Sequence, residues 1–277
     1  MSVPLKRRAR KQVRKLVKYP EFAWREATAS SRCFPDLVIV GAQRSGTSSL
    51  HRWLCSQPGV QPALVKEVQY FDVNYAKGER WYKAHFPVRR DGIFTFEASP
   101  YMLFHPLAPE RAVRLLPEQT KFVVLLREPV TRTISQYWHE KHAGFETESL
   151  ERALELEPDR LRGTFEAVAR GENSFAHKHF SYVARSEYAP QLRRWREAVA
   201  PERLLVLESE QLFGSSHATD DLLDWLGLPA NRAPFPTVNA AARSRELDDQ
   251  SVSNLREHFD SANQELFELL GRKLWID

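Results

Sequence analysis

One stretch near the N-terminus constrains the fold more than any other part of the chain. Residues 36–50 read Asp-Leu-Val-Ile-Val-Gly-Ala-Gln-Arg-Ser-Gly-Thr-Ser-Ser-Leu, so a short apolar run leads into a loop bounded by Gly41 and Gly46. A strand, a glycine-bracketed loop and an amphipathic helix in this order are typical of nucleotide-binding α/β domains, in which loop amides and the helix N-terminus bind phosphate. The stretch therefore predicts an anionic nucleotide site at the end of a buried strand.

The loop differs from the triphosphate-binding pattern Gly-x-x-x-x-Gly-Lys-[Ser/Thr] at one position. Thr47 stands where that pattern requires lysine, and the cation of the loop is Arg44 instead. The missing lysine normally reaches the terminal phosphates of ATP or GTP, so the loop favours a different anionic nucleotide. Backbone amides, hydroxyls and one guanidinium are available to bind it. The residues expected to hold the anion are Arg44, Ser45, Gly46, Thr47, Ser48 and Ser49.

Short apolar runs alternate with stretches of helical spacing along the rest of the chain. The runs cover residues 37–40, 93–96, 122–126 and 204–207, and residues 252–271 have the spacing of a C-terminal helix. Continuous apolar strands between amphipathic helices indicate a parallel sheet covered on both faces. We therefore predict an α/β fold of the P-loop type, with a central parallel sheet flanked by helices. Its ligands should bind beyond the carboxyl ends of the strands.

The positive charge of the chain is concentrated in an N-terminal arm. The chain has 40 Lys and Arg against 36 Asp and Glu, a net charge of +4, and eight of the basic residues lie between Lys6 and Lys18. Without those eight the balance is 32 against 36, a net charge of −4. We predict a basic arm over residues 1–30 that contacts a membrane surface, or else a solvated terminal helix. Residues 31–277 should form a single domain that does not bind nucleic acid.

Composition also predicts where the protein resides. No apolar stretch approaches the ~20 residues needed to span a bilayer, and the first residues lack an apolar signal-peptide core. Cys33 and Cys55 are too few for a disulfide framework. We therefore expect a cytoplasmic protein whose basic arm allows peripheral contact with a membrane.

A second junction between a strand and a helix repeats the layout of the first. The run 122–126 ends at Arg127, and a helix is expected to follow. Three polar residues of that helix are spaced three and four apart and share one face: Arg132, Ser135 and His139. An arginine at a strand end and a serine one turn into a helix fit a second phosphate. Alternatively, Arg127 makes an ordinary ion pair with Glu128 or Glu97.

A candidate general base lies between these two junctions. Lys66 and Glu67 stand next to an aromatic pair, Tyr70 and Phe71. A carboxylate against apolar rings can have a raised pKa, which suits proton abstraction. Lys–Glu pairs are also common on solvated surfaces, so both interpretations remain open at this point.

Taken in order, the three segments resemble sulfotransferases that use 3′-phosphoadenosine-5′-phosphosulfate (PAPS), closest to the heparan sulfate O- and N-sulfotransferases. The resemblance covers about residues 34–275. It implies that residues 41–47 form the 5′-phosphosulfate loop, with Arg44 where a lysine is usual. It also implies that Glu67 is the catalytic base and that Arg127 and Ser135 hold the 3′-phosphate. The co-substrate would be PAPS, the acceptor a glycan or a small molecule, and no metal would be required.

Two further segments are similar to parts of this family. Residues 185–188 resemble a segment that approaches the nucleotide, which makes Tyr188 a candidate contact. The late Lys-Gly-Arg loop of the family reads Ala-Ala-Ala-Arg over residues 240–243, so Arg243 alone remains as a candidate phosphate contact.

Two departures affect the expected catalytic centre. Ala98 stands where heparan-type members carry lysine, which speaks against a heparan-like acceptor, and Lys66 is the candidate replacement for that charge. His139 falls where the N-sulfotransferase branch has a catalytic histidine. A catalytic role and an ordinary helix-face histidine are both open for it.

Two other functions fit parts of the chain. A P-loop kinase or NTPase would need a loop lysine, which Thr47 contradicts, and a magnesium-binding carboxylate at a strand end, which Glu97 or Glu128 would satisfy. A polyanion-binding or membrane-surface protein led by residues 6–18 would bind in a salt-dependent way. The acceptor is expected to contact residues 145–180, which carry basic and aromatic side chains in no pattern that identifies it.

Overall fold

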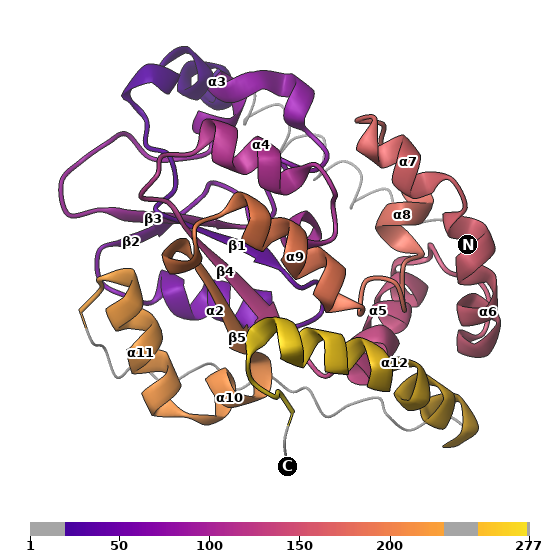
Figure 1. The fold of residues 1–277 in the computed structure, drawn as a ribbon. Helices are drawn as coiled ribbons and strands as arrows, with labels where there is room; N and C mark the ends of the chain where they lie inside the picture. Colours follow the sequence, from indigo (N-terminus) through magenta and orange to yellow (C-terminus); the bar gives the residue numbers. More distant parts are fainter. Residues whose placement is uncertain (1–19, 230–248, 276–277) are drawn as a thin grey trace.

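The structure, a computed structural model, describes residues 20–229 and 249–275. Arg243 and the basic residues 6–18 lie outside the described residues. Five strands form one parallel sheet in the order β2-β3-β1-β4-β5 (Figure 1). The strands are β1 (Leu37–Gly41), β2 (Val60–Pro62), β3 (Phe94–Ala98), β4 (Lys121–Leu126) and β5 (Leu204–Glu208). The predicted central parallel sheet is confirmed. The short edge strand β2 was not predicted, because three residues ending in proline carry no strand periodicity.

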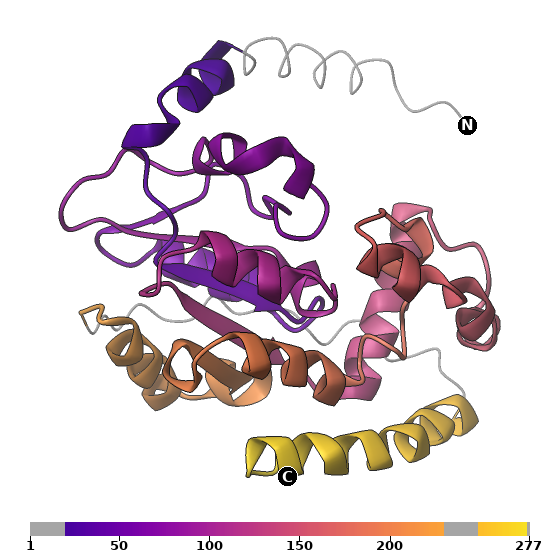
Figure 2. The ribbon, with the colours of Figure 1, turned by 45° about the horizontal axis from the view of Figure 1, so that its top comes forward.

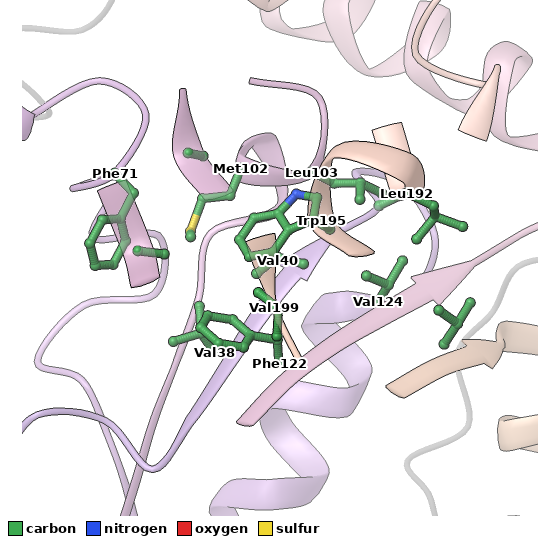
Figure 3. Close-up of a cluster of buried hydrophobic side chains, with 14 of the residues drawn as sticks. Val38, Val40, Phe71, Met102, Leu103, Phe122, Val124, Leu192, Trp195 and Val199 are labelled. Atoms are coloured by element: carbon green, nitrogen blue, oxygen red, sulfur yellow. The ribbon is translucent and has the colours of Figure 1, made fainter. Parts of the chain in front are cut away.

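Helices cover both faces of the sheet. On one face lie α4 (Ala108–Leu115), α9 (Tyr188–Ala198) and α12 (Asp249–Leu270), and on the other lie α2 (Thr47–Cys55) and α11 (Ser216–Leu226). Alternate residues of β1 point to opposite faces, as the pleat of a strand requires. Val38 and Val40 therefore join the core that contains Trp195 (Figure 3), whereas Leu37 and Ile39 pack with α2 and α11.

A group of helices stands at one end of the molecule. It consists of α5 (Pro129–Ala143), α6 (Leu150–Leu161), α7 (Thr164–Ala169) and α8 (Phe175–His179), which lie together in both views (Figures 1 and 2). Glu128 begins α5, since its carboxylate accepts the amides of Val130 and Thr131. The remaining elements are α3 (Gly78–Lys83), α10 (Ser209–Gly214), η1 (Ala29–Ser31), η2 (Tyr75–Lys77), η3 (Pro100–Leu103) and η4 (Pro201–Arg203).

Part of the predicted basic arm packs against the domain. Residues 20–27 are helical, and the Arg25 guanidinium donates to the carbonyls of Ala84 (2.6 Å) and Phe86 (2.9 Å). Figure 2 shows this helix on the opposite side of the molecule from α12. The predicted boundary at residue 30 therefore lies inside packed structure. Among residues 20–229 and 249–275, no helix is long and apolar enough to cross a membrane.

The carboxyl ends of neighbouring strands are joined by backbone hydrogen bonds. The Ala42 amide after β1 donates to Leu125 of β4 (2.8 Å), and the Ser99 amide after β3 donates to Ile39 of β1 (3.1 Å). The segment after β2 is attached in the same way, by Glu67 N–H to Ala98 O at 3.0 Å. These bonds gather the chemistry-bearing loops at one edge of the sheet, as expected for a parallel α/β domain.

Candidate active site

The two glycines of the nucleotide loop are required by close packing. A Cβ atom on Gly41 would lie 2.4 Å from Leu103 Cβ, and one on Gly46 would lie 2.4 Å from a ring carbon of Phe213. Gly46 also has φ +88°, in the left-handed region that favours glycine. Arg44 adopts φ +72° between them. A side chain at either glycine would push the loop off the sheet, so the spacing of five is a packing requirement.

The N-terminus of α2 supplies fewer donors than the sequence predicts. The amide of Ser45 already donates to Ala42 O (3.2 Å), and its carbonyl is 2.7 Å from the Ser209 hydroxyl, so Ser45 stabilises the loop from within. Within the described part of the chain, the amides of Thr47 and Ser48 have no hydrogen-bond acceptor. Gly46, Thr47 and Ser48 thus form the open helix end at which an anion is stabilised. Ser49, like Thr47, is buried, whereas Ser48 is exposed.

Arg44 connects the loop to the helix that follows β4. Its Nε donates to Ser135 Oγ at 3.1 Å, and its Nη1 is 3.5 Å from Nδ1 of His139. Ser135 and His139 therefore share a face of α5, as predicted, and that face is turned to the loop. Partial burial, followed by the Arg44 cation, lowers the pKa of His139. The imidazole is neutral near pH 7 and can accept a hydrogen bond or a proton.

Arg132 also reaches the loop from α5, but from a buried position. Its side chain is fully buried, donates to Ser186 Oγ and reaches the carbonyl oxygens of Tyr182 and Gln43. Arg132 consequently supports the loop from the interior.

Arg127 stands at the end of β4 with its carbonyl and guanidinium both engaged. Its Nη1 donates to Arg44 O (3.4 Å), its Nε is 3.8 Å from Glu210 Oε1, and its carbonyl accepts the Tyr188 hydroxyl (2.9 Å). Neither ion pair considered from the sequence forms, because Glu128 caps α5 and Glu97 is buried. Tyr188 is buried as well. Its hydroxyl supports Arg127, and its contact with a nucleotide remains a prediction.

Glu67 lies in a backbone segment of unusual conformation. Glu67 and Gln69 both have positive φ, +63° and +53°, a conformation that is uncommon for non-glycine residues and is enriched at functional sites. The Glu67 carboxylate accepts Lys66 Nζ at 3.0 Å on one oxygen and Gln69 Nε2 at 3.3 Å on the other. Lys178 of α8 donates to the Gln69 amide oxygen at 3.0 Å. The carboxylate is thus oriented by a chain of three polar side chains.

Of the two interpretations that the sequence leaves open for Glu67, the structure excludes enclosure by aromatic rings. Its side chain is 41% exposed, whereas Tyr70 and Phe71 are buried in the core with Tyr82. Because the left-handed conformations at Glu67 and Gln69 reverse the chain, sequence neighbours point in opposite directions. Glu67 and Arg44 both act electrostatically on His139, which places the carboxylate near the same helix α5.

Several functional contacts escaped the sequence analysis. Lys178 and Gln69 are 109 positions apart, and Arg185 and Gln43, which are also hydrogen-bonded, are 142 apart. Ser209 holds the loop from α10. Single polar residues in variable surroundings carry no periodicity or spacing, so no pattern in one sequence could have identified them.

Comparison with known proteins agrees with this geometry. The family model for the sulfotransferase domain matches residues 34–268, most of the chain. The chain belongs to the sulfotransferase family. A sulfotransferase from Alicyclobacillus acidocaldarius has a similar structure, with a TM-score of 0.72 and 25% identity over 87% of this chain and 98% of that one. The kinase alternative therefore does not describe the family of this protein.

Curated members of the sulfotransferase family match over most of this chain. Bifunctional heparan sulfate N-deacetylase/N-sulfotransferase 1 of Caenorhabditis elegans is 28% identical over 88% of it, and heparan sulfate glucosamine 3-O-sulfotransferase 3B1 of Homo sapiens is 26% identical over 90%. The chain spans 28% and 66%, respectively, of the length of these two relatives.

Proposed function

We propose that this protein transfers a sulfuryl group from PAPS to a hydroxyl or amine of a glycan or small molecule. The observation that carries the proposal is the convergence of three segments at one sheet edge. Arg44 and the α2 N-terminus come from the first, Glu67 from the second, and Arg127 with Ser135 from the third. Two anion-binding groups and a carboxylate base are what a doubly phosphorylated donor and a protic acceptor need.

The chain's own residues fit the two anionic ends of PAPS. The open amides of Thr47 and Ser48 and the Arg44 guanidinium suit the phosphosulfate end. Arg127 and Ser135 suit the 3′-phosphate, with Tyr188 supporting Arg127 from below. Arg243 is proposed as a further phosphate contact and lies outside the described residues. PAPS supplies the sulfuryl group when it is bound.

The acid–base chemistry falls to Glu67. Its carboxylate accepts the proton of the acceptor hydroxyl or amine, while Lys66 and Gln69 keep it in one orientation. The sulfur leaves the bridging phosphate oxygen as it bonds to the acceptor, and adenosine 3′,5′-bisphosphate is released. Arg44 and the loop amides stabilise the negative charge that builds up on that phosphate. His139, neutral and 3.5 Å from Arg44, contacts the same region and can hydrogen-bond the acceptor.

We propose that the acceptor carries little negative charge, unlike the heparan sulfate named for the relatives. Residues 145–180, which include α6 to α8, contain five Lys and Arg against eight Asp and Glu. Arg160 and Arg162 are moreover paired with Glu146 and Asp159. Ala98 offers no cation where heparan-type members have lysine. A polyanion would be repelled by such a surface.

The basic arm is proposed to attach the protein to an anionic membrane surface at the cytoplasmic side. Eight cations between Lys6 and Lys18 without an acid are enough for salt-dependent attraction to anionic lipid. Sedimentation with phosphatidylserine vesicles should be lost when residues 1–19 are deleted. Binding that survives the deletion would exclude this role.

Calorimetry with two nucleotides tests the donor assignment. Adenosine 3′,5′-bisphosphate without metal should bind to one site per chain, and ATP with Mg²⁺ should bind at least tenfold more weakly. The reverse order of affinities would contradict the proposal. Transfer is then measured with labelled PAPS and pooled neutral acceptors, with mass spectrometry of the products.

A further inference from the structure

Two arginines beneath the nucleotide loop are buried and form no ion pair within the described part of the chain. Arg132 is 0% exposed and Arg185 is 1% exposed. Within residues 20–229 and 249–275, no carboxylate oxygen lies within 4.0 Å of either guanidinium. A buried charge is strongly disfavoured unless it is paired or densely hydrogen-bonded. Two such cations side by side therefore call for a physical reason.

Both arginines converge on one residue of the loop, Gln43. Arg132 Nη1 lies 3.4 Å from the Gln43 carbonyl, and Arg185 Nη1 donates to the Gln43 side-chain oxygen. The two cations come from different elements, Arg132 from α5 and Arg185 from the segment before α9. Gln43 is thus held at its backbone and its side chain by two separate parts of the fold.

The other contacts of Arg185 orient it without neutralising it. Its Nη2 donates to the carbonyls of His177 (3.0 Å) and Lys178 (2.8 Å) and to Ser181 Oγ (3.0 Å). Its guanidinium carbon also lies 5.1 Å and 5.0 Å from the ring centres of Tyr101 and Phe104. Neutral acceptors and rings solvate the cation. Its unit charge remains.

The carboxylates that act electrostatically on the two arginines, Glu157 and Glu140, are hydrogen-bonded to other groups. Glu157 accepts the amides of Val183 (2.8 Å) and Ala184 (3.0 Å), and Glu140 accepts from Gln136 and faces His179. Burial also raises the pKa of Glu157 to about 7, so that it is only partly ionised near neutral pH. Among the described residues, Nε of Arg185 has no acceptor. Both cations thus stand against the loop at Gln43, with no carboxylate hydrogen-bonded to either among the described residues.

We propose that Arg132 and Arg185 are positioning residues of the donor site. They hold Gln43, and through it the loop between Gly41 and Gly46, and they provide a buried positive charge that the bound anionic nucleotide neutralises. This inference rests on the proposed function of the loop. In the free protein the two buried charges raise the electrostatic free energy, and a bound anionic nucleotide lowers it again. The affinity for the nucleotide therefore depends on the conformation of the loop that the two arginines hold.

Binding of adenosine 3′,5′-bisphosphate, measured by calorimetry on the full chain, tests the proposal. Arg185→Met should raise the Kd at least tenfold, and Arg185→Lys, which keeps the charge but loses the planar fork, should fall between Met and wild type. The matched control is Arg160→Met, because Arg160 is also largely buried but pairs with Glu146 at 2.6 Å. This control should lower the melting temperature and leave the Kd within about twofold.

A double-mutant cycle separates positioning from a general structural role. Gln43→Leu removes the side-chain oxygen that Arg185 contacts and leaves the backbone carbonyl that Arg132 contacts. It should by itself raise the Kd several-fold, and this result tests the link even if Arg185→Met does not fold. When combined with Arg185→Met, its effect should be clearly less than additive, because both changes break the same link.

Four results overturn the inference: additive losses, an unchanged Kd for Gln43→Leu, a Kd for Arg185→Lys as weak as for Arg185→Met, or a weakened Kd in the Arg160→Met control. If wild-type protein bound no bisphosphate, the proposed function would fail with it. If wild type binds and the variants bind equally well, only the inference fails.

Discussion

Arg44 and Ser135 are 91 positions apart, yet the Arg44 guanidinium donates to the Ser135 hydroxyl over 3.1 Å. The first residue belongs to the loop after β1 and the second to the helix after β4, and these strands are neighbours in the sheet. The bond therefore joins the segment assigned to the phosphosulfate with the segment assigned to the 3′-phosphate. Together with the Arg127 contact to the Arg44 carbonyl, it holds the two anion-binding groups next to each other.

Replacing Arg44 should affect the transfer step more than donor binding. Arg44→Ala removes a cation from the place where charge develops, so kcat should fall by about 10²-fold or more, while the Kd of adenosine 3′,5′-bisphosphate rises much less. Steady-state transfer of labelled sulfate gives kcat, and calorimetry gives the Kd of adenosine 3′,5′-bisphosphate. Arg52→Ala on the exposed side of α2 is the control and should change neither quantity. A loss confined to binding would contradict the assignment.

Glu67→Gln should abolish turnover without weakening the binding of the nucleotide. The glutamine amide keeps the size of the side chain, although its hydrogen bond with Lys66 is weaker. It cannot take up the proton of the acceptor hydroxyl or amine. Single-turnover assays and bisphosphate calorimetry provide the measurements, with Glu79→Gln on the exposed surface of α3 as control. Near-normal transfer by Glu67→Gln would show that another group is the base.

Arg127→Ala should discriminate between nucleotides. The change is expected to weaken the binding of adenosine 3′,5′-bisphosphate at least tenfold, because Arg127 is assigned to the 3′-phosphate. The binding of adenosine 5′-monophosphate, which lacks that phosphate, should hardly change. Competition binding on one protein preparation gives both affinities. Equal losses for the two nucleotides would mean that Arg127 only maintains the loop through its 3.4 Å contact with the Arg44 carbonyl.

Stability should fall as the pH rises from about 4.5 to about 7. Burial raises the pKa of Glu97 to about 7, although the hydroxyls of Tyr82 and Ser99 oppose the shift. Between pH 4.5 and pH 7 the folded protein therefore holds a proton that the unfolded chain has released. The part of the free energy of unfolding that depends on this proton is fully present below pH 4.5 and is lost as the pH rises to 7. The shift corresponds to about 3 kcal/mol at most.

Glu97→Gln is the variant that tests this dependence. Denaturant unfolding at several pH values should give a flatter pH profile of the free energy of unfolding for Glu97→Gln than for wild type. Asp72, whose pKa is likewise raised to about 7 by burial, remains in both proteins and leaves part of the slope. Parallel profiles for the two proteins would show that Glu97 is ionised in the fold.

The regular parts of this protein were predictable because they repeat a pattern. β1, β3, β4 and β5 lie at the apolar runs that predicted strands, and α2, α5 and α12 lie where helices were expected. The glycine spacing and the family resemblance identified Arg44, Glu67, Arg127 and Ser135 as candidates before any geometry was known. Whether these residues carry the proposed roles is left to the experiments above.

By itself the sequence determined the parallel α/β sheet, the glycine-bounded loop and the membership in a family, since these depend on local periodicity and spacing. Only the tertiary structure decided which side chains meet. It turned Glu67 away from the rings beside it, buried Arg132 beneath the loop and brought Arg185 to Gln43 and Lys178 to Gln69. The physical reason is that such contacts depend on backbone reversals and on elements more than 100 positions apart, whose relative placement is set by the packing of the whole domain.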